Sequence, residues 1–235
     1  MGTCRSDMNV LLGCEESQAV CIEFRKRGHN AFSCDMLPCS GGHPEWHLQM
    51  DIFEAIRSRR WDLMIAFPPC TYLTNSAEWA YSDGPYHQKV KPSTLVGADR
   101  RQAREKALRF VCDLLNAPIQ KKAIENPIGQ ISRRIKWGGQ KWEVAPSKTD
   151  DGIRPQIIQP WWFGDDASKA TCIFRVNLPP LKPTTPCAPR VVNGKNRWSN
   201  QTDGGQNKLS PGDDRALLRS KTYPGIARAM AAAWG

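Results

Sequence analysis

Residues 61–70, WDLMIAFPPC, form a continuous apolar run with one acid that stops at two prolines and a cysteine. An uninterrupted run of this length is typical of a central parallel strand buried on both faces. Proline fixes φ and offers no backbone N–H, so the pair ends the strand and presets the direction of the next side chain. We therefore expect Cys70 on a stiff, exposed turn at the carboxyl end of a central strand.

Strand and helix patterns alternate on both sides of this run. Such alternation predicts an α/β domain with a parallel sheet and crossover helices on both of its faces. Three regions show little periodicity and are expected as a long loop after Cys70, a second loop and a small irregular lobe: residues 71–97, 138–160 and 179–214. The expected strands are 9–12, 31–34, 61–67, 122–124 and 171–176, and the expected helices are 18–27, 52–59, 99–115 and 226–234.

The composition favours a basic protein of the cytoplasm. The 235 residues include 33 Lys and Arg against 23 Asp and Glu, which gives a formal net charge of +10. A surplus of this size favours a polyanionic partner, and nucleic acid is the usual one. Because neither a secretory signal nor an apolar run of membrane-spanning length is apparent, we expect no membrane partner and mostly reduced thiols among the nine cysteines.

Polar side chains follow successive predicted strands at the point where each strand ends. Glu15, Asp35, Cys70 and Glu125 have this position, and Asp51 precedes the second predicted helix. In open parallel sheets ligands bind beyond the carboxyl ends of the strands. We therefore expect these five side chains to line one site.

The residue types at two of these strand ends suit covalent pyrimidine chemistry. A thiolate at position 70 is a nucleophile, and a carboxyl group at position 125 can hydrogen-bond N3 and the amino group of cytosine. Asp35 is placed to accept hydrogen bonds from ribose hydroxyls. No GxGxxG motif is present, which disfavours a dinucleotide site. Taken singly, each feature has a structural alternative: a buried cysteine, a turn cap or a solvated loop acid.

An ordered set of short motifs extends over most of the chain. Together the motifs closely resemble those of small phage-type DNA cytosine-5 methyltransferases, which use S-adenosylmethionine. They are CEESQ at 14–18, RGH at 27–29, SCD at 33–35, HPEWH at 43–47, PPCTYL at 68–73, ENP at 125–127, QPWWFG at 159–164, KAT at 169–171 and TYPGIA at 222–227.

The resemblance implies a Rossmann-like methyltransferase sheet and a role for each motif. Cys70 would attack C6 of a flipped cytosine, and Glu125 would hold N3. Lys169 and Thr171 would stand where larger family members carry arginines that contact the cytosine and the catalytic loop. The helix from Gly225 would complete the cofactor pocket. The methyl donor would be bound by Cys14, Glu15, Ser17, Asp35, Met36, Asp51, Ile52 and Pro68.

The resemblance also implies double-stranded DNA as the partner of a monomeric enzyme. We expect a catalytic domain over 1–176, a target-recognition lobe over 177–215 and a C-terminal helix within 216–235. Because the lobe is short, few bases would be read. The expected DNA contacts are Thr71, Asn75, Ser76, Lys89, Lys91, Arg100, Arg101, Arg104, Lys195 and Arg197.

Several alternatives remain open at this stage. Amino-methylating DNA enzymes place a polar residue before Pro-Pro and an aromatic residue after it, unlike Phe67 and Cys70. A catalytically silent DNA-binding protein, an RNA substrate and a modified methyl donor are further possibilities. The tryptophans at 161 and 162 are candidates for base stacking, although packing is their commoner role. Zinc ligation is a less favoured hypothesis for four residues spaced C-x4-C-x3-H-x3-H: Cys34, Cys39, His43 and His47.

Overall fold

A seven-stranded sheet with the order β3-β2-β1-β4-β5-β9-β8 forms the centre of the computed structural model, which describes residues 7–87, 89–209 and 220–235. Two small hairpins, β6-β7 and β10-β11, lie outside it. The strands of the large sheet are β1 Asn9–Gly13, β2 Asn30–Asp35, β3 His47–Gln49, β4 Leu63–Ala66, β5 Lys121–Pro127, β8 Gln156–Ile158 and β9 Thr171–Val176.

The strand directions divide the sheet into a parallel part and a reversed strand. β1 pairs in parallel with β2 and β4, β2 with β3, and β4 with β5. β9 runs antiparallel to both of its neighbours, β5 and β8. The predicted Rossmann-like α/β class is confirmed, but the expectation that every strand is parallel is wrong at β9. No crossover helix separates β8 from β9, and strands joined without a crossover pair antiparallel.

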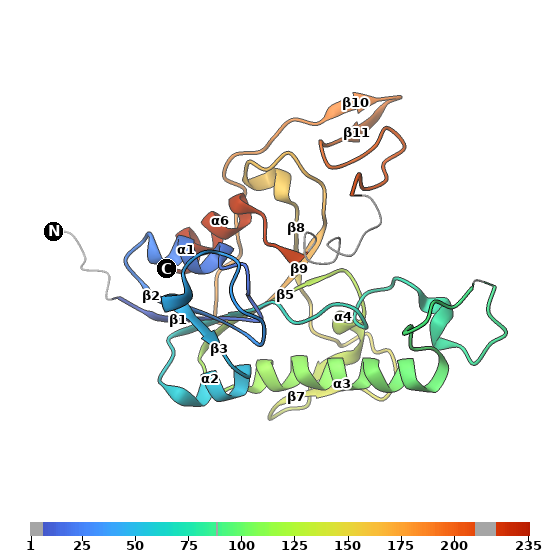
Figure 1. The fold of residues 1–235 in the computed structure, drawn as a ribbon, viewed down its shortest axis with the longest axis horizontal. Helices are drawn as coiled ribbons and strands as arrows, with labels where there is room; N and C mark the ends of the chain where they lie inside the picture. The colour runs from blue at the N-terminus through green and yellow to red at the C-terminus, as the bar shows by residue number, and fades with distance from the viewer. Residues whose placement is uncertain (1–6, 88, 210–219) are drawn as a thin grey trace.

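Helices cover both faces of the sheet, as expected (Figure 1). On one face, α1 Ala19–Arg25 packs against α6 Pro224–Trp234, and their apolar side chains meet β1 and β4 in one core. On the other face, α2 Ile52–Ser58 and α3 Gly97–Asn116 form a second core with the sheet.

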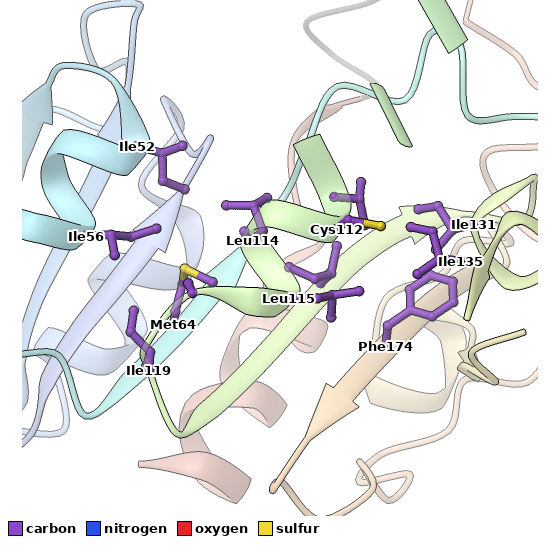
Figure 2. Close-up of a cluster of buried hydrophobic side chains, with 14 of the residues drawn as sticks. Ile52, Ile56, Met64, Cys112, Leu114, Leu115, Ile119, Ile131, Ile135 and Phe174 are labelled. Carbon is purple, nitrogen blue, oxygen red and sulfur yellow. The ribbon is translucent and has the colours of Figure 1, made fainter. Parts of the chain in front are cut away.

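The second core joins elements that are far apart in the sequence. Figure 2 shows Met64 of β4 near Ile56 of α2, and Phe174 of β9 near Leu115 of α3. All but Ile56 of these four side chains are at most 2% exposed, and Ile56 is 7% exposed. Burying a side chain of this size contributes roughly 1.5–3 kcal/mol, so this cluster fixes α3 against the strands that carry the polar ends.

The structure contains the long helices and strands at the positions that the sequence patterns predicted. It also contains short elements that were not predicted. The predicted loop at 138–160 contains β7 Trp142–Val144 and β8, and the predicted lobe contains β10 Arg190–Val192 and β11 Lys195–Arg197. A strand of three residues is too short to show a period. The remaining elements are α4 Ile131–Arg134, β6 Ile135–Trp137 and the 3-10 helices η1 Pro44–Trp46, η2 Glu78–Tyr81 and η3 Pro160–Phe163.

Two further observations concern the described residues as a whole. None of their helices is long and apolar enough to cross a membrane. None of their eight cysteines takes part in a disulfide. Part of the predicted recognition lobe and the start of the predicted C-terminal segment, residues 210–219, lie outside the described residues.

Candidate active site

The turn that carries Cys70 is held by its own backbone. Pro68 is buried, and Cys70 is partly exposed. The carbonyl oxygen of Cys70 accepts hydrogen bonds from the backbone N–H of Leu73 at 3.0 Å and of Thr74 at 3.2 Å. Because these bonds close one helical turn, the thiol stands on a defined scaffold at the end of β4.

Asn126 ties the Cys70 turn to the neighbouring strand. β5 extends to Pro127, three residues beyond the predicted strand, and therefore includes Glu125 and Asn126. Asn126 is 1% exposed, and its Nδ2 donates to the carbonyl oxygen of Pro68 at 3.0 Å. The predicted nucleophile and the predicted acid thus lie at the ends of adjacent parallel strands. Sequence analysis did not single out Asn126, although the ENP motif contains it.

Glu125 interacts with Lys169 and Thr171, which the sequence analysis assigned to the same site. β9 is paired so that Glu125 faces Ile173 and Pro127 faces Thr171. Burial raises the pKa of Glu125, while the positive charge of Lys169 and a hydrogen bond with Thr171 oppose that rise. A carboxyl group whose pKa is raised can carry a proton and donate it to a ring nitrogen.

Two arginines of α3 clamp the segment that follows Cys70. Arg104 donates from Nε to the carbonyl oxygen of Tyr72 at 2.9 Å and forms an ion pair with Glu78 at 2.6 Å. Its guanidinium carbon lies 3.4 Å from the ring centroid of Tyr81. Arg100 lies over the rings of Tyr72 and Tyr81. Each arginine is 7% exposed.

This clamp corrects the expectation that Arg100 and Arg104 face DNA phosphates. Both guanidinium groups are committed to the protein, because their positions fall on the buried face of α3. The beginning of the predicted long loop is therefore held in place by α3. The segment after β5 holds it from the other side, since Gln130 donates from its backbone N to Leu73 at 2.7 Å and from Nε2 to Asn75 at 2.7 Å.

The end of β1 lies next to the residues that are expected to bind the cofactor. A Cβ atom at Gly13 would lie 2.0 Å from Cδ1 of Ile52, so the Ile52 side chain of α2 packs directly against the end of β1. Burial, followed by the charges of Asp35 and Asp51, raises the pKa of the Cys14 thiol to about 12. Two of the predicted donor-binding acids therefore flank the same residue.

The predicted acids also have structural tasks. The carboxylate of Glu15 accepts hydrogen bonds from the backbone N of Val20 at 2.6 Å and of Cys21 at 3.2 Å, at the start of α1. Burial raises the pKa of Glu15 to about 8. Asp51 is the N-cap of α2, and Asp35 accepts from the backbone N of Leu37 at 2.9 Å. Ser17 is partly buried in the loop between β1 and α1.

An exposed apolar surface adjoins these acids. Met36 is 68% exposed and Leu37 is 57% exposed, directly after Asp35. Large apolar side chains with that exposure, beside two carboxylates, offer a flat surface for a purine and acceptors for hydroxyl or amino groups. The residues present therefore fit an adenosine-containing cofactor.

Some of the other expected DNA contacts are exposed side chains, and others already bind groups of the protein. Thr71, Ser76, Lys89 and Lys91 are exposed side chains. Arg101 donates to the carbonyl oxygen of Tyr81 and pairs with Asp83 at 2.9 Å. Lys195 is exposed on β11, whereas Arg197 donates to the backbone carbonyls of Asp203 and Asn196.

The four residues of the zinc hypothesis have separate partners. Cys34 is buried, and its thiol lies 3.4 Å from the carbonyl oxygen of Met50. The ring of His47 lies 2.8 Å from the hydroxyl of Ser33, and the ring of His43 stacks on Trp46. Among the described residues, no group of three or more His, Cys, Asp or Glu is arranged to hold a metal ion.

No protein-family model and no curated protein matches the chain. Among solved structures, the chain is similar to an Escherichia coli prophage protein described as a candidate DNA modification methyltransferase, with a TM-score of 0.41 and 13% sequence identity. The similarity covers 77% of this chain and 52% of that protein, so this chain spans about half of its length.

Proposed function

We propose that this protein is an S-adenosylmethionine-dependent DNA cytosine-5 methyltransferase whose nucleophile is Cys70. The observation that carries the proposal is the hydrogen bond from Asn126 to Pro68, which joins the Cys70 turn to the strand that ends with Glu125. A stiff thiol and a buried carboxyl group on neighbouring strand ends are the pair that covalent attack on a pyrimidine requires.

Cys70 accounts for the bond to C6, and Glu125 accounts for the proton on N3. The Cys70 thiolate adds to C6 of the cytosine while the Glu125 carboxyl group gives its proton to N3, which makes the ring electrophilic. S-adenosylmethionine, when bound beside Asp35 and Met36, would supply an electrophilic methyl group to C5, and its sulfur would keep the electron pair of the broken bond and leave as S-adenosylhomocysteine. A base removes the C5 proton, the C6–sulfur bond breaks, and N3 returns its proton to Glu125.

Lys169 and Thr171 set the protonation of Glu125. Their charge and hydrogen bond favour the carboxylate, while burial favours the protonated acid. The balance lets Glu125 both give and take back the N3 proton. We expect Glu125→Gln to reduce turnover by about 10²–10⁴-fold, the usual contribution of a general acid, with little loss of DNA affinity.

The donor site combines the apolar surface and the acids around β1. Met36 would pack against the adenine, Asp35 would accept from the ribose hydroxyls, and Asp51 would accept from the adenine amino group through the oxygen that α2 leaves open. An Asp35→Ala variant should bind the donor at least tenfold more weakly by calorimetry, and unchanged affinity would remove Asp35 from this role.

Duplex DNA as the substrate is supported by the charge surplus of the chain. C5 of cytosine lies inside the duplex, so the base must be extruded at a cost of a few kcal/mol. Exposed basic side chains after the Cys70 turn, including Lys89 and Lys91, are available to hold the phosphates on either side. No metal ion takes part in this mechanism.

A methyl-transfer assay with tritiated S-adenosylmethionine and duplex DNA tests the proposal. We expect the wild-type protein and the control Cys187→Ser to label DNA, and Cys70→Ser to retain donor binding but transfer no label. Digestion of the product should place the label on C5. Label on an amino nitrogen, label only on RNA, or no label from the wild-type protein would each contradict the proposal.

A further inference from the structure

The β10-β11 hairpin is a two-stranded ribbon with a tight turn. Asn193 and Gly194 form its turn with φ values of 49° and 72°. Two successive residues with positive φ are typical of the type I′ turn, whose twist matches that of paired strands. The ribbon stands apart from the large sheet, at the top of Figure 1.

One face of this hairpin is committed to the protein. Arg190 faces Arg197 across the ribbon, and both bind the following turn. Arg190 pairs with the Asp203 carboxylate at 2.5 Å, and Nε of Arg197 donates to the Asp203 carbonyl oxygen at 3.0 Å. Gln201 adds a carbonyl acceptor for Arg190 at 2.8 Å.

The other face is open and carries two side chains suited to a base pair. Val191 lies directly opposite Asn196, and side chains opposite each other in a ribbon point to the same side. Val191 is 67% exposed, and Asn196 is exposed. An asparagine can form two hydrogen bonds with adenine N6 and N7 in the major groove, and an apolar side chain can contact the thymine methyl group.

The surroundings of the ribbon fit a polyanion. Residues 187–209 contain four basic side chains and one acidic side chain. Lys195 is exposed at the ribbon's turn end. A two-stranded ribbon has the width that the major groove of B-DNA admits. Arg190 and Arg197 are engaged with the protein, so the available charge near the ribbon comes from the exposed Lys195 and Lys208. Together with the width of the ribbon, this charge makes duplex DNA the occupant that we assign to the open face.

The base of the hairpin is fastened to the segment that leads into β9. Trp198 stacks on Trp161 with ring centroids 5.4 Å apart and an interplanar angle of 21°. Asn200 exchanges two hydrogen bonds with the backbone of Ser168, at 2.9 and 3.0 Å. Lys169, whose charge acts on Glu125, is the next residue. The tryptophan at 161 thus has a packing role, and the open face is held at a fixed place relative to the catalytic acid.

We propose that the open face of the β10-β11 hairpin reads an A·T pair in the major groove beside the target cytosine, with Asn196 on the adenine and Val191 on the thymine methyl group. This inference rests on the proposed function for its target, but it concerns DNA binding rather than methyl transfer. The specificity determinants are thus Asn196 and Val191, which sequence analysis did not single out, and Lys195 is a phosphate contact.

Selection of duplexes from a randomised DNA pool by the full-length protein, without methyl donor, tests the hairpin directly. We expect the wild-type protein to enrich a short sequence that contains one fixed A·T pair. Asn196→Ala should lower the preference at that pair by roughly 5- to 150-fold, the range for loss of one bidentate contact, and leave the other positions unchanged. Anisotropy with the selected duplex made with thymine or with uracil at that pair measures the methyl contact, and Val191→Ser should weaken the preference for thymine.

The control is Asn30→Ala, another exposed asparagine, at the start of β2, whose side chain contacts Asn9. It should enrich the wild-type sequence. An unchanged preference in Asn196→Ala, or a wild-type protein that enriches no sequence, would overturn the assignment of the hairpin. Absence of methyl transfer with intact selection would instead count against the proposed function alone.

Discussion

Two groups of basic side chains illustrate opposite uses of the same residue type. Arg100 and Arg104 lie under the Cys70 turn, each 7% exposed, with their guanidinium groups bound to carbonyls, a carboxylate and tyrosine rings. The hairpin group, Arg190, Lys195 and Arg197, lies at the surface, and only Lys195 projects without a role in holding the ribbon together. The first group fixes the Cys70 turn, and the second supports the face that we assign to DNA.

The difference lies in burial rather than in residue type. A buried guanidinium must be paired, because an unpaired buried charge costs several kcal/mol, and once paired it is no longer available to a ligand. An exposed lysine is solvated and is free to replace counterions on DNA. Counting charges in a sequence therefore overestimates the surface that can bind DNA.

The largest expected effect is that of removing a buried arginine on the free energy of unfolding, which removal of the exposed hairpin lysine should not change. Arg104→Ala removes the ion pair with Glu78, one of the two donors to the carbonyl oxygen of Tyr72, and the contact with the ring of Tyr81. We expect a loss of about 2 kcal/mol in the free energy of unfolding, measured by urea titration, because the Glu78 carboxylate is partly exposed and becomes solvated. Methyl transfer should fall at least tenfold even where the protein is fully folded, since the Cys70 turn loses its clamp.

Arg109→Ala provides the matched control, because Arg109 is exposed on the same helix. Its free energy of unfolding should stay within about 0.5 kcal/mol of the wild-type value, as for most surface substitutions. Equal effects of the two substitutions would mean that the clamp contributes nothing specific.

Glu15 is a buried acid, and it can be compared with the buried arginines of α3. Burial raises the pKa of Glu15 from 4.5 to about 8. An acid with a raised pKa stabilises the fold below its unfolded-state pKa, and this contribution is lost as pH rises through the folded-state pKa. Over about 1.5 pH units between those values, the free energy of unfolding should fall by about 2 kcal/mol.

The Glu15→Gln variant should lack this part of the pH dependence, because glutamine does not ionise. Urea titrations between about pH 5 and pH 6.5 measure it. The exposed variant Glu54→Gln should follow the wild-type curve. A Glu15→Gln protein with the full wild-type slope would show that other groups cause the dependence.

The smallest expected effect concerns the exposed lysine of the hairpin. Lys195→Ala should weaken duplex binding by a few fold at low salt and reduce the slope of log affinity against log salt by about one, with no change in sequence preference. Fluorescence anisotropy at several salt concentrations measures this slope. Arg104→Ala should leave the slope unchanged, and a reduced slope in that variant would contradict the division between the two groups.

The sequence predicted the parts of the molecule with long patterns. The apolar run that ends at Cys70 and the helix over 99–115 were located to within about two residues, because each covers several periods. The antiparallel direction of β9 and the three-residue strands were not predictable, since they depend on pairing with distant segments. The strand ends that carry Glu125 and Cys70 were recognised, but not the link between them through Asn126.

The role of the α3 arginines was missed although the sequence contained a signal for it. Arg100 and Arg104 are spaced by four residues and continue the row of Leu108, Cys112 and Leu115, which are buried. A basic residue in phase with the apolar face of a helix is a candidate for a buried ion pair. The burial of Glu15 at the start of α1 had no comparable signal, because it depends on how the loop after β1 folds back.

The most direct test of the central claim is the trapping of Cys70 on duplex DNA in which 5-fluorocytosine replaces cytosine in one strand. After addition of the thiolate to C6 and methylation of C5, a fluorine in place of the C5 proton blocks the elimination that would release the protein. We predict a denaturation-resistant adduct that requires S-adenosylmethionine and that peptide mass spectrometry places on Cys70. Methyl transfer to ordinary duplex DNA without any such adduct would contradict the covalent mechanism.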